Sequence, residues 1–69
     1  MNSLNQISST CKDRRLFLNL TQKQLSELTG IKQAEISKFE SGKKDLFVGT
    51  LVRITDALGL QIELKIIEK

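Results

Sequence analysis

The residues that most often carry out chemistry in proteins are scarce in this sequence. It has no histidine and a single cysteine, Cys11, among 69 residues. A base–nucleophile pair that uses histidine is therefore excluded, and one cysteine without histidine is a poor set of metal ligands. The sequence also lacks paired acids in a recognisable motif and a glycine-rich loop that could grip a phosphate. We expect no enzyme activity, no metal and no cofactor, and we interpret Cys11 as a small core residue.

The chemistry that remains is that of basic and amide side chains, and the charges are unevenly distributed. Residues 12–44 contain eight lysines or arginines and four acids, a net charge of +4. Residues 45–69 contain three bases and four acids, a net charge of −1. A basic module that faces a polyanion fits this distribution. An ordinary solvated surface fits it equally well, so charge alone does not identify a partner.

Helical patterns at both ends of the chain are predicted to position these side chains. Apolar residues at helical spacing predict a first helix from Leu4 to Leu18, ended by Asn19, and a last helix from Thr50 to Leu58, ended by Gly59. The helical residues expected to face the core, together with Ile31, are Leu4, Ile7, Cys11, Leu18, Leu25, Leu28, Ile36, Phe39, Leu51, Ile54 and Leu58.

Two short helices joined by a glycine are predicted in the middle of the chain. Thr21 and Gln24 have the spacing of a capping box, so a helix is expected to begin at Gln22. This helix must end at Gly30, the residue that takes a positive φ at least cost. A further helix is expected from about residue 32 to residue 41, with Gly42 as its terminator. The pattern is that of a helix-turn-helix.

The stretch LTQKQLSELTGIKQAEISKFESGKK resembles the helix-turn-helix of the Cro/C1-type repressor family. The resemblance covers about residues 11–60 and implies a compact all-α domain of four or five helices. Ser26 stands where the family usually has alanine. Residues 16–18, Leu-Phe-Leu, are more apolar than the family pattern, and we interpret them as extra core, with a partner contact as the alternative.

The resemblance implies that the helix after Gly30 lays its N-terminal end in the major groove of double-stranded operator DNA. The residues expected to face base edges are Lys32, Gln33, Ala34, Ser37 and Lys38. Those expected to hold the phosphate backbone are Gln22, Lys43 and Lys44. Glu35 could accept from cytosine, but solvating the helix is the favoured interpretation because phosphates repel it.

One charged pair is assigned to structure instead of to DNA contact. The resembled family commonly places an arginine late in its first helix against the glutamate that ends its recognition helix. Here these residues are Arg15 and Glu40. The planar guanidinium suits a fixed carboxylate, so we predict a structural salt bridge.

The C-terminal residues LQIELKIIE alternate between apolar and other positions, which predicts a β-strand over residues 60–67. No other segment is expected to pair with it, so the partner is expected to be the same strand of a second copy across a two-fold axis. The apolar face of this dimerisation strand consists of Leu60, Ile62, Leu64 and Ile66. We therefore expect a helix-turn-helix domain over residues 4–59 and a homodimer held by residues 60–67.

A repressor domain followed by such a strand also resembles antitoxins of the HipB type, which implies a HipA-like kinase toxin as a partner and autoregulation of a shared operon. Two alternatives stay open: a protein-interaction module that neutralises a toxin with little DNA binding, and a stand-alone repressor. No apolar run approaches the roughly 18 residues that span a bilayer, and the first ten residues do not resemble a signal peptide. We expect a cytoplasmic protein.

Overall fold

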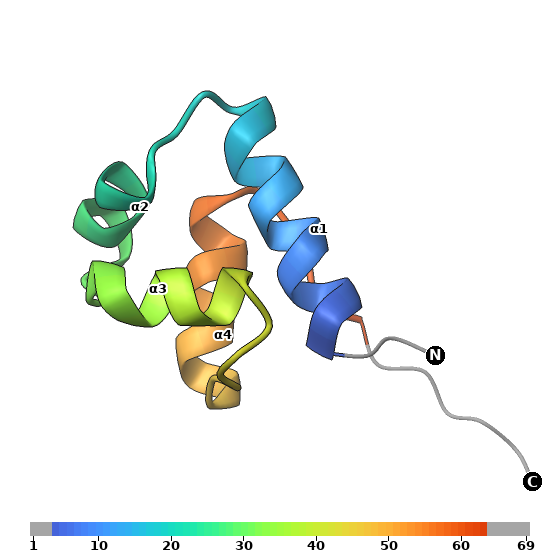
Figure 1. Cartoon of the computed structure of the whole chain (residues 1–69). Coiled ribbons are helices and arrows are strands. Elements are labelled where there is room, and N and C mark those ends of the chain that lie inside the picture. The colour runs from blue at the N-terminus through green and yellow to red at the C-terminus, as the bar shows by residue number, and fades with distance from the viewer. Residues whose placement is uncertain (1–3, 64–69) are drawn as a thin grey trace, which may run out of the picture.

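The computed structural model describes residues 4–63 and contains four helices in this range (Figure 1). The helices are α1 (Leu4–Phe17), α2 (Gln22–Thr29), α3 (Gln33–Glu40) and α4 (Val48–Ala57). Helix α2 packs against both α3 and α4, and α1 packs against α3. The expected all-α helix-turn-helix fold is thus confirmed. None of the helices within residues 4–63 is long and apolar enough to cross a membrane.

Helix α1 ends as its sequence predicted. Asn19 has a φ of 58°, in the left-handed region that terminates a helix. The N–H groups of Asn19 and Leu20 donate back to the carbonyls of Leu16 and Arg15 at 3.0 and 3.1 Å. These two hydrogen bonds form the Schellman arrangement, which satisfies carbonyl groups that the helix end would otherwise leave unpaired.

Helix α4 begins at Val48, two residues before the expected Thr50. Gly49 lies inside its first turn, where the N–H groups have no helical partner, so the low helix propensity of glycine costs little. The first turn is closed by the N–H of Leu51, which donates to the carbonyl of Phe47 at 2.9 Å.

The core lies between the four helices and consists of apolar side chains that the sequence pattern had identified. Ile7 and Leu51 are half-buried and pack against it. The buried members are Cys11, Leu25, Ile31, Ile36, Phe39, Ile54 and Leu58.

The expected burial of Leu28 on the inward face of α2 is wrong. Leu28 is 63% exposed, and Thr29 is buried in its place. The inward face of α2 therefore runs from Leu25 to Thr29, at i and i+4, instead of to the residue at i+3. The Thr29 hydroxyl is buried without penalty because it donates to the carbonyl of Leu25 at 2.8 Å.

The apolar residues at the end of α1 are not extra core. Leu16, Phe17 and Leu18 are 52%, 74% and 36% exposed. The buried face of α1 contains Cys11 and Arg15, four residues apart, so residues 16–18 turn toward solvent. The Arg14 guanidinium lies over the Phe17 ring, 5.2 Å from its centroid.

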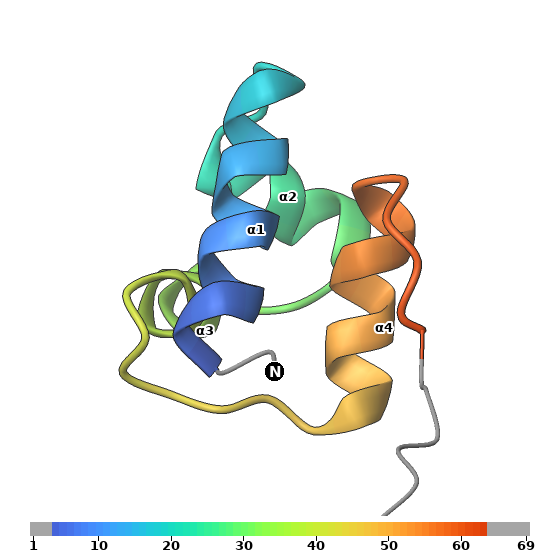
Figure 2. The ribbon, with the colours of Figure 1, turned by 90° about the vertical axis from the view of Figure 1, so that its right-hand side faces the viewer.

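After α4 the chain turns back and runs alongside that helix (Figure 2). Gly59, at a φ of 69°, makes this reversal as expected. Residues 60–63 have neither helical nor strand structure, and residues 4–63 contain no strand. Leu64 and Ile66 lie outside the described residues. The pairing of residues 60–67 across a dimer therefore stays a prediction.

Candidate nucleic-acid interface

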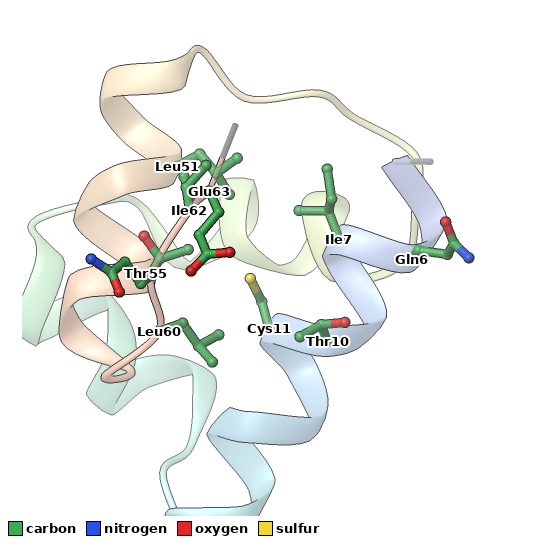
Figure 3. Close-up of a pocket in the computed structure, with 10 residues that line it drawn as sticks. Gln6, Ile7, Thr10, Cys11, Leu51, Thr55, Leu60, Ile62 and Glu63 are labelled. Atoms are coloured by element: carbon green, nitrogen blue, oxygen red, sulfur yellow. The ribbon is translucent and has the colours of Figure 1, made fainter. Parts of the chain in front are cut away.

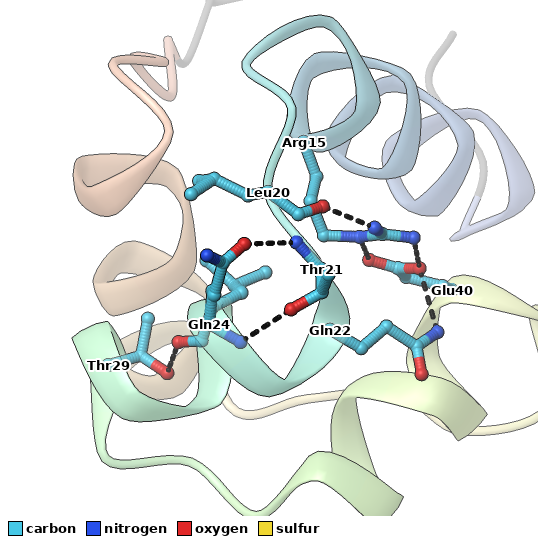
Figure 4. Close-up of polar contacts among 8 residues, drawn as sticks. Arg15, Leu20, Thr21, Gln22, Gln24, Thr29 and Glu40 are labelled. Atoms are coloured by element: carbon cyan, nitrogen blue, oxygen red, sulfur yellow. Dashed lines mark hydrogen bonds and ion pairs between the residues drawn. The ribbon is translucent and has the colours of Figure 1, made fainter.

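The entry into α2 has the capping box that the sequence predicted (Figure 4). The Gln24 N–H donates to the Thr21 hydroxyl oxygen at 3.0 Å, and the Thr21 N–H donates to the Gln24 side-chain carbonyl at 2.8 Å. Both ends of this pair satisfy N–H groups that have no helical partner. The first turn of α2 is therefore fixed in place.

The turn between α2 and α3 is centred on Gly30, whose φ is 74°. A residue with a Cβ is strained in this left-handed conformation, and glycine is not. The Gly30 N–H donates to the carbonyl of Ser26 at 2.8 Å, which ends α2. Ile31 then enters the core, 4% exposed, so α3 starts in a fixed direction.

Helix α3 presents one polar face to solvent and one apolar face to the core. Ile36 and Phe39 are buried. The five residues expected to read base edges are all exposed on or beside the first turns of α3, namely Lys32, Gln33, Ala34, Ser37 and Lys38. Within α3 these residues fall at i, i+1, i+4 and i+5, so the structure brings their side chains together on one surface.

The exit from α3 lies beside the lysines expected to hold phosphates. Gly42 has a φ of 76° and acts as the terminator. The Lys43 N–H donates to the carbonyl of Lys38 at 2.9 Å, so the backbone hydrogen bond ties residue 43 to the last turn of α3. Both Lys43 and Lys44 are exposed.

Arg15 and Glu40 form the predicted salt bridge, and this prediction is confirmed. Arg15 Nε lies 2.7 Å from Glu40 Oε2, and Nη2 donates to Oε1 at 2.8 Å. The guanidinium also donates to the carbonyl of Leu20 at 2.7 Å. The hydrogen bonds to Glu40 raise the pKa of Arg15 above its usual value, and burial opposes this increase. The two-point contact with Glu40 joins α1 to the end of α3, and the bond to Leu20 adds the loop before α2.

Gln22 extends this network. Gln22 is the first residue of α2, and its Nε2 donates to Glu40 Oε1 at 3.1 Å (Figure 4). This bond holds the amide group between the start of α2 and the end of α3. An amide nitrogen carries two N–H groups, so one remains after this bond. The expected phosphate-holding residue is therefore positioned by the same carboxylate that binds Arg15.

The structure pairs Glu35 with Lys44, which the sequence analysis did not foresee. Lys44 Nζ lies 3.7 Å from Glu35 Oε1, and the two side chains are 47% and 40% exposed. The pairing supports a solvating role for Glu35. No sequence pattern identifies this pair, because the turn at Gly42 brings the two residues together.

The side chains of three further residues, Ser26, Thr29 and Arg53, form hydrogen bonds to the backbone of the turn. Of these, Ser26 is the one that departs from the family pattern. The Ser26 hydroxyl donates to the carbonyl of Ile31 at 2.5 Å. The Ile31 N–H donates to the Thr29 hydroxyl at 3.2 Å, and Arg53 Nη2 donates to the carbonyl of Thr29. The sequence marked Ser26 as a departure from the family's usual alanine, but it did not predict this hydrogen bond. Arg53 comes from α4, so no local signal could have identified it.

On the other side of the molecule, a groove of about 380 Å³ lies between α1, α4 and residues 60–63 (Figure 3). Leu60 is half-buried against the core, and Ile62 is 42% exposed. Cys11 lines the groove and is 2% exposed, as expected for a core residue. Burial and, secondarily, the Glu40 charge raise the pKa of the Cys11 thiol from 9.0 to about 11.

A helix-turn-helix family model matches residues 12–65, which is most of the chain. The chain belongs to the Cro/C1-type helix-turn-helix family. This family consists of DNA-binding transcriptional regulators, and the Gly30 turn and the exposed face of α3 are its defining geometry here.

Solved structures of two regulators are similar to this chain. A serine-to-alanine variant of HipB in a complex with an O2 20-mer is 31% identical, with 99% of this chain and 94% of that chain covered and a TM-score of 0.84. HipB in a HipA-HipB-O2-O3 complex gives the same identity and TM-score, over 99% and 96% of the two chains. A tyrosine-to-phenylalanine mutant of the restriction-modification controller protein C.Esp1396I is 27% identical, with 88% and 80% covered and a TM-score of 0.79. The sequence matches none of the curated proteins.

Proposed function

We propose that this protein is a sequence-specific DNA-binding repressor that reads its operator with the exposed face of α3. The observation that carries the proposal is the joint exposure of Lys32, Gln33, Ala34, Ser37 and Lys38 beyond a turn of fixed geometry. Ammonium, amide, hydroxyl and methyl groups are the groups that recognise base edges in the major groove. Their position at the start of the second helix is where a helix-turn-helix contacts bases.

Each side chain has a suitable base partner. Gln33 can form two hydrogen bonds with the N6 and N7 atoms of adenine, and Ala34 can contact a thymine methyl. Lys32 or Lys38 can donate to O6 or N7 of guanine, and Ser37 can bond to several bases. The exposed rotamers of these residues are free to adapt, because Ile36 and Phe39 hold the opposite side of α3 in the core.

Gln22, Lys43 and Lys44 are assigned to the phosphate backbone. The remaining N–H of the Gln22 amide and the N-terminus of α2 both attract a phosphate. Lys44 would exchange Glu35 for a phosphate on docking, and an exposed pair at 3.7 Å opposes this exchange only weakly. These contacts fix the orientation of the domain but carry no sequence information.

The repressor is proposed to act as a homodimer that pairs through residues 60–67. The half-exposed Ile62 and the groove beside it leave apolar surface uncovered in a single chain. A second copy would cover this surface and would set two α3 helices at a fixed separation.

Within this class, similarity to HipB over 99% of the chain supports an antitoxin that represses its own operon and binds a HipA-like kinase. Two other functions remain candidates: a stand-alone repressor without a toxin, and an interaction module that neutralises a toxin with little DNA binding. The similarity to a restriction-modification controller protein supports the stand-alone repressor, because the name of that protein includes no toxin.

Two measurements distinguish these functions. The first is the affinity of the chain for the DNA upstream of its own gene, at two salt concentrations. The second is purification of the chain from its source cells, with mass spectrometry of retained proteins. An antitoxin repressor binds the DNA and retains a HipA-like kinase, whereas a stand-alone repressor only binds the DNA. An interaction module retains the kinase but shows no salt-dependent DNA binding.

A further inference from the structure

The α2–α3 turn is held by side chains from two directions. From within α2, the Ser26 hydroxyl donates to the carbonyl of Ile31, the first residue after the turn, at 2.5 Å. From α4, Arg53 Nη2 donates to the carbonyl of Thr29, the last residue before the turn. The carbonyls on both sides of Gly30 are therefore fixed by side chains that lie outside the turn.

Gly30 and Arg53 also restrict each other. A Cβ on residue 30 would lie 2.8 Å from Arg53 Nη2, closer than real Cβ contacts allow. Any side chain at position 30 must therefore displace the guanidinium that binds the Thr29 carbonyl. Arg53 thus contacts the turn itself as well as the end of α2.

We propose that Ser26 and Arg53 are positioning residues, which set the direction of α3 relative to α2 and thereby determine specificity without contacting DNA. The proposal rests on the DNA-binding function proposed above. A turn that loses one of these hydrogen bonds can adopt other angles, and only a fraction of the molecules would then present α3 correctly. The apparent affinity for the operator falls in proportion to that fraction. Loose backbone binding to any duplex does not need this angle, so it should change little.

The chain provides a matched control for each variant. Arg14 Nε donates to the carbonyl of Leu58 at the end of α4, at 2.9 Å, as Arg53 does at the end of α2. The buried Ser8 hydroxyl donates to a backbone carbonyl within α1, that of Asn5, at 3.2 Å. Arg14→Met and Ser8→Ala therefore remove the same groups as Arg53→Met and Ser26→Ala, but far from the turn in sequence.

The first arm of the experiment measures hydrogen exchange at the Gly30 and Ile31 amides, without DNA. Ser26→Ala and Arg53→Met should each accelerate exchange at these amides about fivefold. The loss of one ordinary hydrogen bond raises the equilibrium constant for local opening by about this factor. Ser8→Ala and Arg14→Met should leave them unchanged. Unchanged exchange in both turn variants would overturn the proposal, even if the protein proved not to bind DNA.

The second arm compares a selected operator with a scrambled duplex. Each turn variant should lose up to about fivefold in operator affinity, because the fraction of correctly angled turns falls at most by the factor by which the opening constant rises. The affinity for the scrambled duplex and the salt dependence should stay unchanged. The control variants should not change the ratio of the two affinities. If Arg53→Met instead weakened both duplexes equally and lowered the salt slope by about 0.9 per lost phosphate contact, Arg53 would be a phosphate ligand and the proposal would be wrong. A wild-type protein that bound both duplexes equally would contradict the proposed function, and hydrogen exchange would still decide whether Ser26 and Arg53 hold the turn.

Discussion

Two features of the structure favour glycine at position 30, the backbone conformation more strongly than the neighbouring side chain. The first is the backbone conformation, with a φ of 74°. The second is the Arg53 guanidinium, which occupies the space that a Cβ would need. The sequence predicted the first feature from the position of Gly30 between two helical patterns. It could not predict the second, because Arg53 is distant in the chain.

Replacement of Gly30 by valine and by asparagine separates these two features. Both residues carry a Cβ that displaces Arg53, but asparagine tolerates the left-handed region and valine does not. Gly30→Val should therefore cost about 1–3 kcal/mol more than Gly30→Asn. For a domain of this size, that difference lowers the melting temperature by about 7–20 °C. Equal melting temperatures for the two variants would show that backbone strain at residue 30 is unimportant.

Cys11 makes stability depend on alkaline pH. Its pKa is raised from 9.0 to about 11 in the folded protein, first by burial. Below pH 9 the thiol is protonated in both the folded and unfolded chain, so it has no effect. Between pH 9 and 11 only the unfolded chain releases the proton, which favours unfolding by about 2–3 kcal/mol in total.

The measurement is the free energy of unfolding from pH 8 to 11 for the wild type and for Cys11→Ala. Lysine titration affects both proteins, so the difference between their curves isolates the thiol. The stability advantage of the wild type should shrink by about 2–3 kcal/mol over this range. Parallel curves would mean that the Cys11 thiol ionises as easily in the folded chain as in water.

At the scale of the helix, local signals were sufficient for boundaries but not for every face. Thr21 and Gln24 specify the start of α2 by their spacing, and Asn19 and Gly42 mark helix ends in the same local way. The burial of Thr29 in place of Leu28 depends on how α2 meets α4, so spacing within α2 could not decide it. Propensity and periodicity describe one element, whereas burial depends on its neighbours.

The same limit applies to the candidate site. The exposure of Gln33, Ser37 and Lys38 followed from the apolar positions of Ile36 and Phe39 on the opposite face of α3. The bond between Gln22 and Glu40 joins two helices, so neither sequence segment alone revealed it.

Helix α3 and the loop after it are expected to contribute differently to DNA binding. Gln33→Ala should lower the affinity for the operator by about 1–3 kcal/mol per half-site and relax the base preference at one position. Lys43→Ala should weaken binding to all duplexes and reduce the salt dependence by about one unit per half-site. Affinities of both variants for the operator and for single-base variants of it, at several salt concentrations, provide the measurement. Indistinguishable behaviour of the two variants would contradict the assignment of α3 to the bases and of Lys43 to the backbone.

At the scale of the whole molecule, a single chain leaves apolar surface uncovered. A domain of this length buries only about 60% of the surface of its unfolded chain, so its stability is marginal. The groove along α1 and α4 and the half-exposed Ile62 lie where residues 60–67 are expected to meet a second copy. Dimerisation would therefore supply stability as well as two linked recognition helices.

The dimer prediction is tested by introducing charges on the apolar face of the strand. Ile62→Glu with Leu64→Glu should give monomers and a large loss of operator affinity, because two α3 helices would no longer be coupled across about 34 Å of DNA. Gln61→Glu with Lys65→Gln makes the same change in net charge on the other face and should leave the dimer intact. Sedimentation of the purified proteins reports the mass. A dimer of unchanged mass in the first variant would place the interface elsewhere.

Selection of duplexes from a randomised pool by the full-length wild-type protein tests most directly whether this molecule is a dimeric DNA-reading regulator. The enriched sequences should contain two related half-sites in inverted orientation, with centres about 10 base pairs or a multiple of that distance apart. The affinity for the enriched duplex should fall steeply as salt increases, as it does when lysines release counterions from phosphates. A pool without enrichment, together with binding that salt does not change, would contradict the assignment of α3 to operator recognition.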